Sequence, residues 1–113
     1  MLATISVDIE LDQEDFEDLC DTAGYVIGHW VQEGQIIGST YRIQEQESDE
    51  WIEITKDGMV QAIVDIIHGK HDISKAIKDS IIHAFTQSDL GDLDGYDIDA
   101  IIQIAALKEI VYG

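Results

Sequence analysis

Alternating apolar and polar residues open the chain, and a helical repeat follows them. Over residues 3–11 the alternation is regular, which places the apolar side chains on one face of a half-buried strand. Asp12 comes next and suits the N-cap of a helix whose first turns are rich in acidic residues. Apolar residues then recur at helical spacing as far as Trp30, so the sequence predicts a helix that ends near Gln32.

The rest of the chain predicts two strands and three more helices. The strands form a hairpin around the polar run QEQESDE, and each helix has one apolar stripe. We expect Thr55 to cap the first of these helices, Gly69 to end it, and Asp97 or Asp99 to cap the last. The predicted elements are strands 39–45 and 51–54, helix 56–68, a helix that begins at Asp72, and a final helix that includes Ile98 and Ile110.

The order of these elements is β-α-β-β-α-α-α, which indicates an α+β fold. We expect one domain over residues 1–113, with a small three-stranded antiparallel sheet packed by about four helices. Gly24 and Gly28 lie four residues apart in the first helix, where they either weaken it or let another element approach closely.

The cysteine and hydropathy patterns indicate an intracellular protein. Cys20 is the single cysteine, so it cannot form an internal disulfide, and its apolar helical position predicts a core residue. The first residues turn acidic at once and do not resemble a signal peptide, and no apolar run approaches 18 residues. We therefore expect a cytoplasmic location and no membrane contact.

Charge is the most unusual property of the sequence. Twenty-four acidic residues face six Lys and Arg, which gives a formal net charge of −18. The acids concentrate in residues 8–21, 45–57 and 89–99, whereas residues 69–78 carry three of the six basic residues. Such a surplus destabilises a compact chain by self-repulsion, and without a basic patch direct binding to nucleic acid is close to excluded.

The acidic stretch SDLGDLDGYDID resembles a calcium loop in composition but not in its ligands. When Gly95 takes position 6 of an EF-hand loop, Leu90 and Ile101 fall at positions 1 and 12, where oxygen ligands are needed. We therefore expect a solvated loop there and no calcium.

No catalytic or metal-binding motif stands out elsewhere. His68, His71 and His83, with Asp72, form the one cluster of potential zinc ligands, and it crosses a predicted helix break. No nucleophile has a recognisable partner, and acids surround Cys20. We expect no metal, no cofactor and no enzymatic activity.

Two segments, CDTAGYVIGHW and DIDAIIQIAALKEIVYG, resemble a family of small, acidic and largely uncharacterised bacteriophage proteins. The resemblance covers about a third of the chain, and His29 stands where the family has an aromatic residue. It implies a phage or prophage origin and brings no activity or catalytic residue with it. The matching residues are Ala23, Gly24, Trp30, Asp97, Asp99, Ile102, Gln103, Ala105, Glu109, Val111, Tyr112 and Gly113.

Charge and resemblance together favour an interaction protein. The first hypothesis is a phage-encoded anti-defence inhibitor that mimics DNA and occludes a basic groove of a host complex, such as a CRISPR effector or a restriction enzyme. Trp30 and Tyr41 are expected in the core, while Trp51 caps a sheet edge or faces the partner. The expected partner-binding residues are Asp12, Glu14, Asp15, Glu17, Asp18, Glu45, Glu47, Asp49, Glu50, Trp51, Asp92 and Asp94.

The second hypothesis is a small-molecule binding module, for instance a phage sponge for a nucleotide immune signal. It requires cationic groups for the phosphates and an aromatic side chain to stack on the base. The chain offers Arg42, three lysines between residues 70 and 78, and its two tryptophans. We rank this hypothesis second because so negative a field repels an anionic ligand. A homodimer, with a pocket between its two subunits, is an alternative that the sequence neither supports nor excludes.

Overall fold

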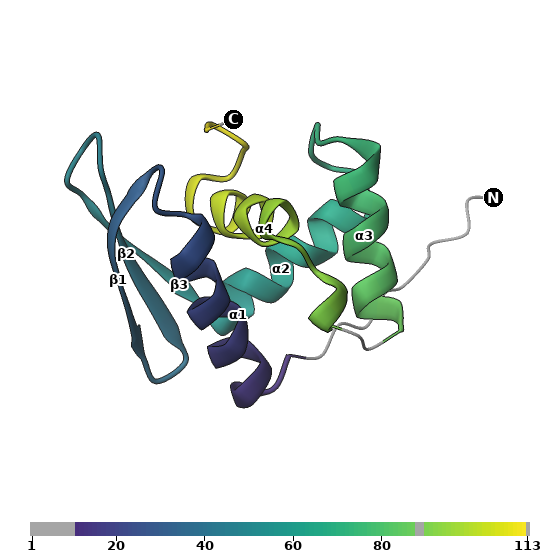
Figure 1. The fold of residues 1–113 in the computed structure, drawn as a ribbon, viewed down its shortest axis with the longest axis horizontal. Coiled ribbons are helices and arrows are strands. Elements are labelled where there is room, and N and C mark those ends of the chain that lie inside the picture. The colour runs from purple at the N-terminus through teal and green to yellow at the C-terminus, as the bar shows by residue number, and fades with distance from the viewer. Residues whose placement is uncertain (1–10, 88–89, 113) are drawn as a thin grey trace.

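Four α-helices and a three-stranded antiparallel sheet make up the part of the protein that its computed structural model describes, residues 11–87 and 90–112 (Figure 1). This confirms the predicted α+β class and its small antiparallel sheet. The strand predicted over residues 3–11 lies outside the described residues, apart from Leu11. The elements are α1 (Gln13–Val26), β1 (Val31–Ile37), β2 (Thr40–Glu45), β3 (Trp51–Thr55), α2 (Lys56–Ile67), α3 (Lys75–Thr86), a 3-10 turn (Leu90–Asp92) and α4 (Gly95–Leu107).

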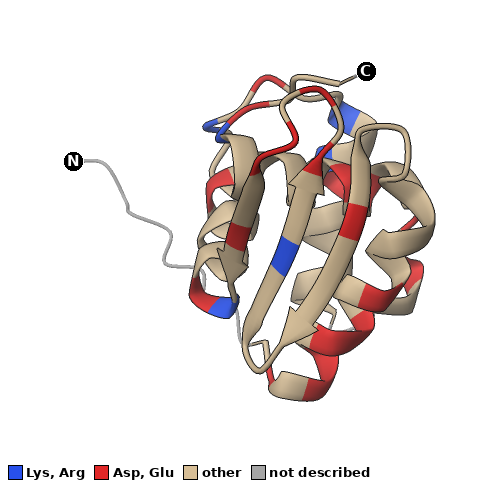
Figure 2. Ribbon diagram, turned by 90° about the vertical axis from the view of Figure 1, so that its left-hand side faces the viewer, with Lys and Arg blue, Asp and Glu red and all other residues tan. Residues whose placement is uncertain are grey.

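The sheet has the order β1-β2-β3, so β2 is the central strand. Gly38, at φ 59°, takes the first position of the two-residue turn between β1 and β2, where glycine tolerates this conformation. Tyr41, Ile43 and Ile54 lie on the inner face and are buried against the helices. The outer face carries no helix in the described part of the chain, and Figure 2 looks directly onto it.

Helix α4 is the centre of the core. It packs against α1, α2, α3 and β3, and eight of its 13 residues are buried, so it is apolar almost all round. Asp94 is its N-cap: the carboxylate accepts from the amide of Asp97, whose own carboxylate accepts from the amide of Asp94. The prediction that Asp97 or Asp99 caps this helix is therefore wrong.

The first helix is shorter than predicted. It ends at Val26, and the residues up to Trp30 form a turn in which Ile27 accepts from the amides of Trp30 and Val31. Ile27 and Trp30 are both buried, at 1% exposure each, so this turn produces the same apolar spacing as a continued helix. The chain then forms β1, which supplies the third strand of the described sheet.

Two other boundaries also differ from the predictions. Ser74, not Asp72, caps α3, because its hydroxyl accepts from the amide of Ile77. At the other end of the chain α4 ends at Leu107, and Ile110, predicted within that helix, lies beyond it and is 37% exposed. By contrast, Cys20, Trp30 and Tyr41 are buried as predicted.

Candidate interaction surfaces

The exposed side of α1 carries a continuous series of carboxylates. These α1 acids are Asp12, Glu14, Asp15, Glu17, Asp18 and, one turn further, Asp21. Asp12 is the N-cap and accepts from the amide of Asp15 at 2.8 Å, which fixes the start of the helix. The helix has no basic residue, so no cation of its own neutralises the series. Figure 2 shows these acids along the helix to the right of the sheet.

Crowding among the α1 acids has an electrostatic effect on Asp15. Partial burial raises the pKa of its carboxyl, and the neighbouring charges of Asp12 and Asp18 raise it further. Beyond the first turn, Glu17, Asp18 and Asp21 accept no side-chain hydrogen bond and form no ion pair with any described residue. These three charges therefore face solvent without an intramolecular partner.

The loop between α3 and α4, part of the acidic stretch SDLGDLDGYDID, lies beside α1 where residues 90–93 are described. A groove of about 400 Å³ is bordered on one side by Asp15, Asp18 and Asp21 and on the other by Leu90, Gly91 and Leu93. Asp92 lies in this loop, 3.5 Å from the His83 imidazole of α3, and Asp94 caps α4. Of the predicted residues, Asp92 thus belongs to the loop beside this groove but faces His83, and Asp94 lies near Val26 at the end of α1.

The hairpin acids Glu45, Glu47, Asp49 and Glu50 form a separate cluster. They lie around the β2–β3 turn, whereas Gln13 at the start of α1 is bonded to Gly38 of the opposite turn at 2.8 Å. The six residues of β2 separate the two turns by about 17 Å. The hairpin acids therefore lie at the opposite end of the sheet from the start of α1, and α1 runs alongside the sheet from there (Figure 1).

Glu45 has a role within the fold. Its carboxylate accepts from the Ser48 hydroxyl at 2.7 Å and from the Tyr112 hydroxyl at 2.7 Å. These two hydrogen bonds hold the pKa of Glu45 below its ordinary value. Asp49 has a left-handed backbone, at φ 59°, and its side chain bonds to Gln32. The hairpin acids thus fix the turn and the end of the chain as well as adding charge.

Trp51 lies on the outer face of the sheet, half-buried, where the guanidinium of Arg42 stacks over its ring at 4.2 Å from the centroid. Arg42 pairs with Gln35 of β1 and Glu53 of β3 across the sheet. The predicted contact residue Trp51 is therefore partly covered by the single arginine of the chain.

Several residues of the phage-family resemblance meet in one buried network. Gln103, 1% exposed, donates to Asp99 and to the carbonyl of Tyr112, and its carbonyl accepts from the amides of Val111 and Tyr112. Asp99 also accepts from the Trp30 indole at 2.9 Å, and the rings of Trp30 and Tyr112 stack at 5.4 Å. This network binds the last residues to α4 and gives a structural reason for these side chains.

Asp99 also borders a cavity of about 580 Å³ between the end of α1 and the start of α4. The imidazole of His29 lies 2.7 Å from the Asp99 carboxylate, and Tyr96 and Asp94 complete the polar lining. No Lys or Arg lines this cavity. Within residues 11–87 and 90–112, no group of three or more His, Cys, Asp or Glu could hold a metal ion.

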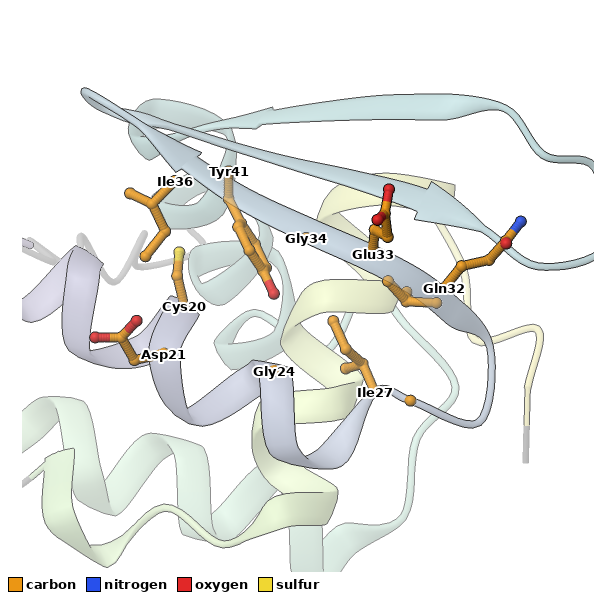
Figure 3. Close-up of a pocket in the computed structure, with 11 residues that line it drawn as sticks. Cys20, Asp21, Gly24, Ile27, Gln32, Glu33, Gly34, Ile36 and Tyr41 are labelled. Carbon is orange, nitrogen blue, oxygen red and sulfur yellow. The ribbon is translucent and has the colours of Figure 1, made fainter.

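Another groove lies between α1 and β1 (Figure 3). This α1–β1 groove has a volume of about 360 Å³ and contains three glycines, Gly24 and Gly28 of the α1 side and Gly34 of β1. The hydroxyl end of Tyr41 enters it from β2, and burial, with Cys20 and Asp21 nearby, raises the pKa of Tyr41 to about 12. The sequence indicated this groove only through the spacing of Gly24 and Gly28.

The chain matches no protein-family model, no curated protein and no solved structure. None of the helices in the described ranges has the length and hydropathy needed to cross a membrane.

Proposed function

We propose that this protein is an acidic binding protein that mimics DNA and occupies the basic groove of a nucleic-acid-binding protein. The observation that carries the proposal is the linear charge density of the α1 acids. From Asp12 to Asp21 the helix rises about 14 Å at about 1.5 Å per residue and carries six carboxylates. That is one charge per about 2.3 Å, between duplex DNA at about 1.7 Å and one DNA strand at about 3.4 Å.

This charge does not help the helix itself. Acids in the first turn interact favourably with the helix dipole, but that effect falls off beyond the first turn. Glu17, Asp18 and Asp21 lie further along, and each has an acidic neighbour three or four residues away. Like charges at this spacing destabilise a helix by about 0.2–0.5 kcal/mol per pair. A binding role gives a reason for a charge series that the fold does not need.

The α1 acids are the primary contact surface in this proposal. Asp92, in the loop beside the adjoining groove, faces His83 and adds to the negative field more than to this surface. The hairpin acids lie about 17 Å from the turn at which α1 begins, and Glu45 is held by Tyr112, so they add to the long-range field more than to the contact.

The partner has a groove lined with Lys and Arg, and the negative field speeds association in a way that salt suppresses. A phage-encoded inhibitor of a host defence complex, acting in the host cytoplasm, fits these requirements. The nucleotide-sponge alternative is weaker, because the cavities bordered by α1 carry carboxylates and no Lys or Arg.

Affinity capture followed by competition tests the proposal. The immobilised protein is incubated with host-cell lysate at about 50 mM salt, and proteins released at about 200 mM salt are identified by mass spectrometry. Each purified candidate is then titrated with duplex DNA in the presence and absence of this protein. We expect mutually exclusive binding. A stable ternary complex of candidate, DNA and this protein would refute DNA mimicry.

Two variants with the same change in charge locate the contact surface. The first, the α1 triple variant, is Glu17→Gln, Asp18→Asn and Asp21→Asn; the second, the hairpin triple variant, is Glu47→Gln, Asp49→Asn and Glu50→Gln. We expect the α1 triple variant to lose at least a hundredfold in affinity for the captured partner and the hairpin triple variant to lose less than tenfold. Equal losses would contradict the assignment of the contact to α1.

A further inference from the structure

Along its outer edge, β1 presents backbone groups that pair with no strand of the described sheet. β1 is an edge strand of the described sheet. Its last pair with β2, Ile37 with Thr40, flanks a two-residue turn. Because hydrogen-bonded pairs alternate along an antiparallel ladder, the amides and carbonyls of Gly34 and Ile36 point away from β2. Within the described chain they have no other backbone partner. The first half of β1 has two features that protect an edge, the charge of Glu33 and a register shift between Val31 and Glu33, whereas Gly34 to Ile37 have no charged residue and no Pro.

Beside this edge the α1–β1 groove is open. A Cβ atom built on Gly24 or on Gly28 would meet no atom within 4 Å, so these glycines leave free space instead of accommodating a neighbouring element of this chain. A volume of about 360 Å³ is in the range of ligand-binding pockets, about 300–1,000 Å³. The groove therefore has room for a side chain from outside.

Tyr41 supplies a polar group inside this groove. The residue is 3% exposed, and its hydroxyl end lines the groove without a side-chain hydrogen bond to any described residue. Figure 3 shows this hydroxyl below β1, directed into the groove toward α1. No buried side-chain nitrogen or oxygen of the described residues lacks a partner, so solvent reaches this hydroxyl from the groove, and a polar group that enters the groove can replace that solvent.

The charge around the groove defines the chemistry of that partner. Asp21 on the α1 wall and Glu33 on β1 are the charged residues of the lining, which contains no Lys or Arg. A lysine ammonium donates hydrogen bonds and carries the complementary charge, so both the Tyr41 hydroxyl and the Asp21 carboxylate suit it.

We propose that the β1 edge binds an extended, lysine-containing segment of another protein as a fourth strand. Gly34 and Ile36 pair with its backbone, and a lysine side chain enters the α1–β1 groove toward Tyr41 and Asp21. This mode of binding adds main-chain affinity to side-chain specificity. It does not depend on the proposed function, since the peptide is tested without the DNA-binding partner, although Asp21 belongs to both surfaces.

The probe for the test is the peptide acetyl-Thr-Lys-Thr-Lys-Thr-Lys-Thr-amide. Its control is the same peptide methylated at every backbone nitrogen, which keeps the charge but cannot pair with a strand. We expect saturable one-to-one binding of the probe in calorimetry and slower hydrogen exchange at the Gly34 and Ile36 amides. The methylated peptide should bind at least tenfold more weakly. Equal binding of the two peptides would show charge attraction alone and overturn the proposal.

Variants of the groove complete the test. Tyr41→Phe removes a hydroxyl without an intramolecular partner in the described chain, so we expect an unchanged melting temperature and about tenfold weaker probe binding. Gly24→Ala and Gly24→Leu both improve helix propensity, but only leucine fills the groove. We expect Gly24→Ala to bind like the wild type and Gly24→Leu to bind at least tenfold more weakly. Equal binding by these two variants would refute the role of the groove in peptide binding. A wild-type dimer that Gly24→Leu abolishes would also refute the proposal, because a second copy of this chain would then occupy the groove.

Discussion

Removing three charges from α1 should stabilise the protein. Glu17, Asp18 and Asp21 make no hydrogen bond or ion pair with their side chains in the described structure, so their neutralisation removes repulsion and little else. The α1 triple variant keeps Asp12, which caps the helix, and keeps the acids of its first turn.

The magnitude follows from the helical spacing. The three residues take part in all five like-charge pairs at i,i+3 or i,i+4 within the helix: Glu14–Glu17, Glu14–Asp18, Asp15–Asp18, Glu17–Asp21 and Asp18–Asp21. At about 0.2–0.5 kcal/mol per pair, the variant should gain about 1–2.5 kcal/mol in the free energy of unfolding. For a domain of this size the melting temperature should rise by about 3–10 °C.

Thermal unfolding followed by circular dichroism measures this gain at about 10 mM and at about 1 M salt. The gain should be large at low salt and nearly vanish at high salt, where the Debye length falls to about 3 Å. The hairpin triple variant loses the same number of charges but not these pairs, so its gain should be smaller. An α1 triple variant that melts at or below the wild-type temperature at low salt would refute the view that these acids strain the helix.

Three further predictions concern the C-terminal network and the acidic loop. Gln103→Leu should lower the free energy of unfolding by about 2–4 kcal/mol, measured by urea denaturation, because it leaves the amides of Val111 and Tyr112 without their acceptor. The pKa of Glu45 is lower in the folded state than its ordinary value of 4.5, so its stabilising contribution is present above that pH and is lost as the pH falls through the folded pKa. The melting temperatures of wild type and Tyr112→Phe should therefore differ at pH 7, begin to converge below pH 4.5 and coincide once the pH is below the folded pKa of Glu45. Millimolar calcium should produce no saturable heat in calorimetry, since Asp94 caps α4 and Ile101 is buried at loop position 12; one-to-one binding abolished by Asp92→Asn with Asp94→Asn would contradict this.

The sequence was informative where local chemistry decides the structure. Thr55 caps α2, and Gly69, at φ 73°, follows its end, as predicted, because capping depends on a few neighbouring residues. β2 and β3 were also predicted within a residue or two, since their alternation and turn are local signals.

The sequence was misleading where tertiary contacts decide the structure. Apolar spacing at Ile27 and Trp30 fits a helix and a buried turn equally well, so the pattern could not locate the start of β1. Gln103 looks like a surface residue in the sequence, and its burial depends on the main chain of residues 111 and 112 returning to α4. The open hydroxyl of Tyr41 follows from the register of β1 on β2, which places Gly34 above its ring.

The position of α4 in the chain has a consequence for biosynthesis. This helix packs against α1, α2, α3 and β3, yet a ribosome makes it after all of them. At about 5–20 residues per second, the preceding 94 residues emerge over about 5–20 s with their apolar surfaces lacking the central helix. We expect mutual repulsion between its many carboxylates to help keep the nascent chain apart from other chains during that interval, and the core to be completed only when α4 leaves the exit tunnel.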